Sequence, residues 1–212
     1  MSGVPHNPDG QPLTVDQALV NINQTADPGL RYYAAWWLGK MRVSQPEAVA
    51  ALLLALKDNT DRSPDGGYPL RRNAARALGK VGHGCDGVIP ALLTCLDCDD
   101  YYVRETAAQA LESLGDTAAV PALVAMLRGG VAAAVQVSGK PHLVQPYNAV
   151  LETLGTLGSA DLVPVIAPFL DHSVPQVSNA AARAMYQITG DVQYAERLVT
   201  MLGHDQLQLR RA

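Results

Sequence analysis

Residues 30–42, with the sequence LRYYAAWWLGKMR, carry four aromatic side chains: Tyr32, Tyr33, Trp36 and Trp37. Helical spacing places Trp37 on the same stripe as the apolar residues of this segment, so we expect it in the core. Tyr33 and Trp36 share a different stripe with Lys40. Rings in that position can stack on a flat ligand or a partner protein, and they can equally fill gaps in packing. Tyr32, Tyr33 and Trp36 are therefore candidate binding residues.

Two arginines are candidates for binding a carboxylate. Arg72 and Arg76 lie outside the repeat position at which arginine recurs in most copies, and a guanidinium holds a carboxylate through two parallel hydrogen bonds. Four other arginines recur at one repeat position: Arg31, Arg71, Arg104 and Arg210. A repeated residue fits a repeated structural need. We expect an arginine ladder whose members pair with acidic residues of the neighbouring turns, such as Asp27, Asp100 or Asp205.

Four tyrosines stand where predicted helices begin: Tyr68, Tyr101, Tyr102 and Tyr147. Stacked along one edge they would form a binding rim, whereas a hydrophobic staple, in which an apolar residue before a helix packs back on it, explains them without a ligand. The repeat positions of Tyr33 and Trp36 hold polar or basic residues further on, among them Arg76 and Gln109. We expect a partly basic lining with one aromatic end, and Tyr101, Tyr102 and Gln109 as further candidate binding residues.

Cysteine and histidine spacing suggests a metal site only in part. Cys95 and Cys98 have ligand spacing, but His83 and Cys85 do not form a suitable second pair, so no metal is expected. The glycine-rich residues 79–84 follow a predicted helix instead of a strand, so they are expected to end that helix and not to cradle a phosphate. Neither a nucleophile elbow nor a carboxylate pair stands out. The residues alone favour a binding scaffold.

The elements that position these residues form a repeat. Residues 30–42, 70–82 and 103–115 align, and each copy has apolar residues at i, i+4, i+7, i+8 and i+11, one face of a helix. In the first copy these are Leu30, Ala34, Trp37, Leu38 and Met41. Equivalent anchors at 30, 70, 103, 146, 177 and 209 lie 31 to 43 residues apart, a period typical of helix pairs. We predict an all-α fold, an α-solenoid of about five HEAT-like helix pairs plus a partial sixth.

The predicted organisation is a flexible lead-in at 1–13 followed by one repeat domain at 14–212, interrupted by an irregular insertion at 129–145. Thr14 and Gln17 have the spacing of a capping box for the first helix. Residues 209–212 copy the opening of the helix at Leu70 and then stop. We therefore expect a chain truncated at its C-terminus, or one whose last face a partner covers.

Composition argues against several function classes. The net charge of −4 is unlike the basic surface that nucleic acid requires. The sequence has no apolar run of membrane-spanning length, and its first residues lack the charged and apolar regions of a signal peptide. Three cysteines, an odd number, favour a reducing, cytoplasmic setting over a disulfide framework.

Several segments resemble one family. RYYAAWWLGKMR at 31–42 closely resembles the E subunits of the E/F-type phycobilin lyases, HEAT-like proteins that attach open-chain tetrapyrroles to phycobiliproteins. VRETAAQALESLGDTAAVPAL at 103–123 is similar to the short repeat first named for that family, which is widespread. KPHLVQPYNAVLETLGTLG at 140–158 and NAAARAMYQITGD at 179–191 are more specific and resemble the E subunit of phycocyanobilin lyase.

The resemblance implies a heterodimer with a homologous F-type subunit. Such a pair would bind phycocyanobilin as substrate, with no cofactor, and add a cysteine thiol of the phycocyanin alpha subunit to the bilin's ethylidene group, reversibly forming a thioether. Tyr33 and Trp36 would stack on the bilin, and Arg72 or Arg76 would hold a propionate. Because the thiol belongs to the substrate, the chain needs no nucleophile of its own. His142 and Tyr147 are the candidates for proton transfer.

Two other functions fit the same repeat fold. The first is a non-catalytic adaptor that binds phycobiliproteins during antenna assembly or degradation. The second is a general HEAT adaptor, which would bind neither bilin nor phycobiliprotein. The aromatic first copy of the repeat favours the lyase.

Overall fold

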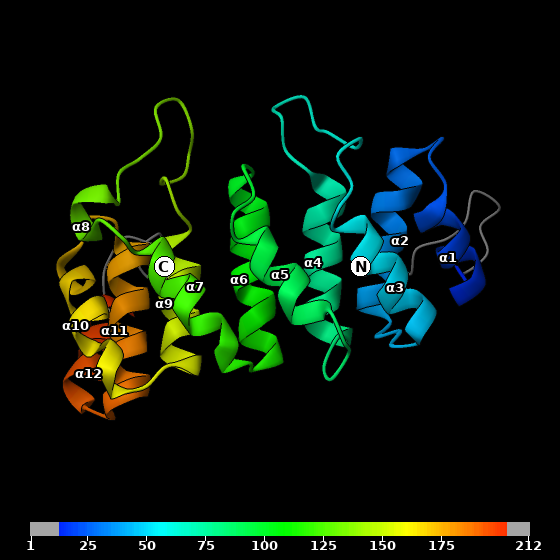
Figure 1. Cartoon of the computed structure of the whole chain (residues 1–212). Helices are drawn as coiled ribbons and strands as arrows, with labels where there is room; N and C mark the ends of the chain where they lie inside the picture. Colours follow the sequence, from blue (N-terminus) through cyan, green and yellow to red (C-terminus); the bar gives the residue numbers. More distant parts are fainter. Residues whose placement is uncertain (1–12, 203–212) are drawn as a thin grey trace. The chain divides into compact units, whose positions relative to one another are not determined.

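The computed structural model describes residues 13–202, and every regular element in that range is a helix (Figure 1). The predicted all-α fold built of helix pairs is therefore confirmed. The chain divides into two compact units, residues 1–114 and 115–212. The expected lead-in lies outside the described residues except for Leu13, which is buried, and the repeat copy at 209–212 lies outside them entirely.

The first unit contains six helices in its described part: α1 (Val15–Asn23), α2 (Pro28–Lys40), α3 (Pro46–Ala55), α4 (Pro69–Val81), α5 (Val88–Cys95) and α6 (Tyr101–Leu114). They pack as the pairs α1/α2, α3/α4 and α5/α6. The second helix of each pair packs on the next, so α2, α4 and α6 stand in a row (Figure 1). These three helices are the aligned sequence copies.

Local signals explain where several helices begin. The Thr14 hydroxyl accepts from the Gln17 N–H at 3.3 Å while the Gln17 side chain accepts from the Thr14 N–H at 3.0 Å, which confirms the capping box. The carboxylate of Asp27 caps α2, and prolines open α2, α3 and α4. Asp100, only 8% exposed, serves two helices, because its oxygens accept from the Tyr68 N–H at 2.7 Å and the Tyr102 N–H at 2.8 Å.

Glycines let neighbouring repeats approach closely. A Cβ on Gly39 would lie 2.7 Å from the Ala77 Cα, and one on Gly79 would lie 2.8 Å from the Ala110 Cα. Gly39 and Gly79 lie inside α2 and α4, and the expectation that residues 79–84 end the second of these helices is confirmed. That end falls at Gly82, and Gly79 is small because another backbone passes beside it.

The apolar stripe forms the core in two copies and departs from the prediction in the first. All five stripe residues of α4 and all five of α6 are buried, and Trp37 in α2 is 5% exposed. Met41, by contrast, is 55% exposed. The helix ends at Lys40, so Met41 lies just beyond it. The next residue, Arg42, has φ +53° and turns the chain away from the helix axis.

The arginine ladder exists, but its partners differ from those expected. Arg31 pairs with Asp58 at 2.8 Å and not with Asp27, while its Nε donates to the Ile22 carbonyl. The side chain of Arg71 donates to the Asp58 carbonyl, and that of Arg104 donates to the Cys98 and Asp99 carbonyls. These arginines chiefly satisfy carbonyl groups at the ends of the preceding helices and turns. Arg210 and Asp205 lie outside the described residues.

The described part of the second unit comprises η1 (Thr117–Ala119), α7 (Val120–Met126), α8 (Gly130–Ala133), α9 (Tyr147–Leu157), η2 (Ala160–Leu162), α10 (Val163–Ile166), η3 (Ala167–Asp171), α11 (Pro175–Thr189) and α12 (Val192–Leu202). Helix α9 packs on α7 and α11, and α12 packs on α11. The insertion at 129–145 holds the short α8 and a hairpin-like turn with an isolated bridge between Gln136 and Leu143. His172 secures the insertion, because its Nε2 lies 3.1 Å from the Ala134 carbonyl oxygen.

Candidate functional site

The aromatic residues of α2 divide into a core residue and a partly exposed group. Trp37 packs in the core, as expected. Tyr33 and Trp36 are half-buried and form a tilted ring pair, with centroids 5.6 Å apart and planes at 32°. Tyr32 beside them is 42% exposed. Burial raises the pKa of the Tyr33 hydroxyl, which has no hydrogen-bond partner among the described residues. Together, Tyr32, Tyr33 and Trp36 make an aromatic surface that can meet a flat ligand.

A hydrogen-bond chain joins this aromatic surface to Arg76. The buried Asn73 of α4 donates from Nδ2 to the Tyr32 carbonyl at 3.1 Å. Its Oδ1 accepts from Arg76 Nη1 at 3.5 Å. Asn73 therefore fixes the register between α2 and α4 and orients Arg76 with respect to the aromatic helix.

Arg72 and Arg76, the two candidate carboxylate ligands, lie in different surroundings. The guanidinium of Arg72 lies over the Tyr102 ring, 4.4 Å from its centroid, and its buried Nε has no partner among the described residues. Tyr102 in turn meets Tyr101 edge-on, with centroids 5.2 Å apart. Burial, followed by the nearby Glu105 charge, raises the pKa of Tyr101 to about 12. Arg72 is thus held in a stack, whereas Arg76 is exposed and better placed to reach a ligand.

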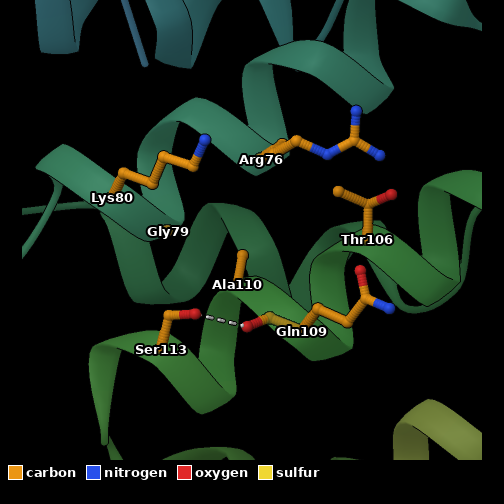
Figure 2. A pocket seen from close by; sticks show the side chains of 7 residues that line it. All are labelled: Arg76, Gly79, Lys80, Thr106, Gln109, Ala110 and Ser113. Atoms are coloured by element: carbon orange, nitrogen blue, oxygen red, sulfur yellow. Dashed lines mark hydrogen bonds between the residues drawn. The ribbon is translucent and has the colours of Figure 1, made fainter. Parts of the chain in front are cut away.

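A groove lies between α4 and α6. Arg76, Gly79 and Lys80 line it from α4, and Thr106, Gln109, Ala110 and Ser113 line it from α6. Figure 2 shows the Arg76 guanidinium beside Thr106 of α6 and the Lys80 side chain extending along α4 toward Arg76. The volume of the groove is about 150 Å³. We call it the cationic groove, because both charged residues in its lining are basic.

Further positive charge surrounds the cationic groove. Slight burial of the Lys80 ammonium lowers its pKa although the residue as a whole is exposed, and the charges of Arg76, Arg42 and Lys40 lower it further. The Arg42 side chain donates to the Lys80 carbonyl at 3.5 Å. None of these four cations forms an ion pair with a carboxylate within residues 13–202.

Arg42 reaches this position from an unusual backbone conformation. Its φ of +53° lies in the left-handed region, at the position after a helix where glycine is the usual residue. The Val43 N–H donates to the Leu38 carbonyl at 3.0 Å, which completes the helix-ending turn. A side chain in this conformation costs roughly 1–2 kcal/mol. The chain carries an arginine there although glycine would fit with less strain.

The tyrosines at the helix entries are mostly structural. Tyr68 is buried between the guanidiniums of Arg62 and Arg71, which lie 4.1 and 3.9 Å from its ring centroid. Tyr147 is 1% exposed and packs against Phe169 with centroids 5.7 Å apart. Tyr147 could transfer a proton to a substrate only by leaving this core, so the geometry does not support the predicted proton transfer by this residue. Burial also raises its pKa.

His142 lies in the insertion of the second unit. Its ring is half-buried, and Nδ1 lies 2.9 Å from the Leu143 carbonyl oxygen. A ring that keeps this hydrogen bond carries its proton on Nδ1. Proton transfer by His142 stays a prediction.

The cysteines show no arrangement for metal binding. Within residues 13–202, no group of three or more His, Cys, Asp or Glu side chains is placed to hold a metal ion. All three cysteines are free thiols. Burial, with a smaller effect of Cys98, raises the pKa of Cys95 to about 11, so this thiol stays protonated and unreactive at neutral pH.

The candidates of the first unit lie on three helices that pack side by side: Tyr32, Tyr33 and Trp36 on α2, Arg72 and Arg76 on α4, and Tyr101, Tyr102 and Gln109 on α6. Lys80 and Arg42 are not among the residues predicted from the sequence. A repeated Gly-Lys pair, Gly39-Lys40 and Gly79-Lys80, was the available signal for Lys80. Nothing in the sequence indicated that Arg42 would turn toward the next repeat.

Two known families match most of the chain. Residues 63–137 and 146–212 match the HEAT repeat family, and residues 30–58 match the family described as the PBS lyase HEAT-like repeat. Within the described residues, no helix combines the length and apolar character needed to cross a membrane.

Individual relatives share more than half of their aligned residues with this chain. The chain is 59% identical over 199 residues to "Phycocyanobilin lyase subunit alpha" of Picosynechococcus sp., covering 94% of this chain and 74% of the relative. It is 58% identical over 203 residues to the protein of the same name from Nostoc sp., covering 96% and 72%. Among solved structures, the complex of CpcE and CpcF of phycocyanin lyase from Nostoc sp. matches with a TM-score of 0.89 and 56% identity, covering 100% of this chain and 78% of that chain.

Proposed function

Because the chain belongs to the family of phycocyanobilin lyase alpha subunits, we propose that it is one subunit of a heterodimeric bilin lyase. With an F-type partner it attaches phycocyanobilin, reversibly, to a cysteine of the phycocyanin alpha subunit through a thioether. The reaction takes place in the cytoplasm, a location that the three free thiols support.

The observation that carries this proposal is the alignment of two kinds of ligand contact in the first unit. An open-chain tetrapyrrole is a flat conjugated molecule with two propionate arms. The half-exposed pair Tyr33–Trp36 offers aromatic faces to the flat ring system, and the exposed Arg76 offers a guanidinium to a propionate. Asn73 connects the helices that carry these two features, because it donates to the Tyr32 carbonyl of α2 and accepts from Arg76 of α4.

The reaction needs positioning more than it needs a reactive group from this chain. The cysteine sulfur bonds to the exocyclic CH carbon of the ethylidene double bond, and that double bond becomes a single bond. The thiol loses its proton and the adjacent ring carbon gains one, so no oxidant or reductant is consumed. Holding thiol and bilin in a reactive geometry supplies a large part of such a rate enhancement. A rigid row of packed helices is suited to this task, because its side chains are fixed relative to one another.

Reconstitution tests the function. The chain is co-expressed with an F-type subunit, the phycocyanin alpha subunit and the enzymes that make phycocyanobilin, and zinc-enhanced fluorescence is recorded on a denaturing gel. We expect a fluorescent alpha-subunit band that requires this chain. An adaptor would bind phycocyanin without producing that band, so binding without covalent fluorescence would contradict the lyase assignment.

A further inference from the structure

The cationic groove has charge and shape that packing between α4 and α6 does not explain. Close approach of the two helices requires only Gly79 and Ala110. Arg76 and Lys80 are instead exposed above that contact, and neither pairs with a carboxylate within residues 13–202. Lys40 and Arg42 add like charge to the same place. A cluster of cations that repel one another is suited to an anionic ligand.

The opposite wall of the groove, on α6, is uncharged: Thr106, Gln109 and Ser113 contribute polar groups and Ala110 is apolar. The Thr106 hydroxyl donates to the Tyr102 carbonyl at 2.8 Å, and the Ser113 hydroxyl donates to the Gln109 carbonyl at 2.9 Å (Figure 2 shows the latter). Both hydroxyl protons are therefore used within α6. Donors for an anion come from Arg76 and Lys80 on α4, with the Gln109 amide opposite them.

The volume of the groove decides which part of a ligand it can take. At about 150 Å³ it is smaller than the roughly 300–1,000 Å³ of pockets that enclose whole small molecules. It can hold a carboxylate on a short alkyl arm, but it cannot hold a tetrapyrrole. The conjugated rings must then lie outside it, and Asn73 links the groove's Arg76 to the aromatic surface of α2.

We propose that the cationic groove is the propionate subsite of the bilin, with Lys80 and Arg76 as the carboxylate ligands and Arg42 and Lys40 strengthening the positive field. This assignment rests on the proposed lyase function and adds the residues that orient the substrate. Lys80 and Arg76 are one helical turn apart, so both can contact the same carboxylate. Fixing this arm would restrict which face and which end of the bilin is offered to the thiol.

The test measures phycocyanobilin affinity in the complex of the full chain with its F-type partner, by titration followed through the bilin absorption spectrum. The variants are Lys80→Gln, Arg76→Gln and the double change. We expect the double variant to bind phycocyanobilin about tenfold or more weakly, because charge-assisted hydrogen bonds to carboxylates are lost. The matched control is Lys57→Gln, which removes an exposed lysine charge beyond α3 and is expected to leave the affinity unchanged.

A second ligand makes the test independent of any variant. Phycocyanobilin dimethyl ester keeps the rings but has no carboxylates, so the wild-type complex should prefer the free acid about tenfold or more. In the double variant the ratio of the two affinities, free acid over ester, should approach one. Equal affinity of the wild-type complex for acid and ester overturns the proposal.

Other outcomes separate this proposal from the proposed function. A wild-type complex that does not bind phycocyanobilin contradicts the lyase function itself, and the groove assignment with it. A double variant that keeps its helical signal and binds phycocyanobilin as tightly as wild type contradicts only the groove assignment. If that variant instead loses affinity for the phycocyanin alpha subunit, the groove binds an acidic protein segment and the propionate proposal is wrong.

Discussion

Replacing Arg42 by glycine is expected to stabilise the chain and to weaken bilin binding at the same time. Arg42 has φ +53°, so the glycine variant relieves roughly 1–2 kcal/mol of backbone strain. Glycine also makes the unfolded chain more flexible, which offsets about 0.5–1 kcal/mol of that gain. The hydrogen bond to the Lys80 carbonyl is exposed and 3.5 Å long, so its loss is a small correction. The net gain is about 0.5–1 kcal/mol.

Thermal unfolding followed by circular dichroism measures this gain. For a chain of this size about 1 kcal/mol corresponds to roughly 2–4 °C, so Arg42→Gly should raise Tm by about 1–4 °C. Arg42→Ala is the matched control, because it removes the guanidinium but keeps a Cβ in the left-handed conformation. A glycine variant whose Tm is no higher than that of the alanine variant would refute the strain explanation.

The same two variants test what the guanidinium does. Both lack the Arg42 charge beside Lys80, so both should bind phycocyanobilin about two- to fivefold more weakly in the complex with the F-type partner. The loss should be equal in the two variants, because it depends on the charge and not on the backbone. Unchanged affinity in both would show that Arg42 makes no contribution to the groove.

Three further predictions concern α2, the helix contacts and acid stability. Trp36→Ala should reduce bilin binding while the helical circular dichroism signal is kept, whereas Trp37→Ala should cost about 3–5 kcal/mol of stability in denaturant titration; equal destabilisation by both would place Trp36 in the core. Gly79→Ala should cost about 1–3 kcal/mol, because the new Cβ would lie 2.8 Å from the α6 backbone, and an unchanged unfolding midpoint would contradict that close approach. Burial alone would raise the pKa of Asp58, but backbone N–H groups and the Arg31 guanidinium outweigh it and lower that pKa. The ionised carboxylate therefore stabilises the fold above the pKa of about 4 of an unfolded aspartate, and this contribution is lost as the pH falls through the lower folded value. Asp58→Asn should flatten the fall in Tm over that acidic range, and a Tm profile as steep as that of the wild type would contradict this role.

The repeat architecture could be predicted because periodicity is a property of local sequence. Apolar residues at helical spacing recur in each copy, and the capping box at Thr14 and Gln17 needs only neighbours three residues apart. Trp37 follows the same stripe and is buried. Family resemblance then connected the aromatic segment with bilin chemistry before any contact was known.

Contacts between repeats could not be predicted in the same way. Arg31 pairs with Asp58, a residue of the following repeat, because the turn after α3 folds back on α2. Gly39 and Gly79 give no sign in the sequence of what lies beside them, and only the packed helices show that another backbone passes there. Sequence spacing reports which residues share a face of one helix, but it does not report which residue of another helix faces them.

The candidate site was predicted in part for the same reason. The spacing of Tyr33 and Trp36 placed both rings on one side of α2, and the structure shows them in contact. Arg72 and Arg76 differ in their surroundings because Arg72 stacks on the Tyr102 ring, which belongs to the next repeat. Tyr147 was chosen for its chemistry, and its burial against Phe169 depends on packing that the sequence does not reveal.

A crystal structure of the complex with its F-type partner and phycocyanobilin tests the central claim most directly. We predict bilin density along α2, α4 and α6 of the first unit, with a ring against Tyr33 and Trp36 and a propionate within hydrogen-bonding distance of Lys80 or Arg76. Density for the bilin elsewhere, with the cationic groove unoccupied by either propionate, would contradict the account.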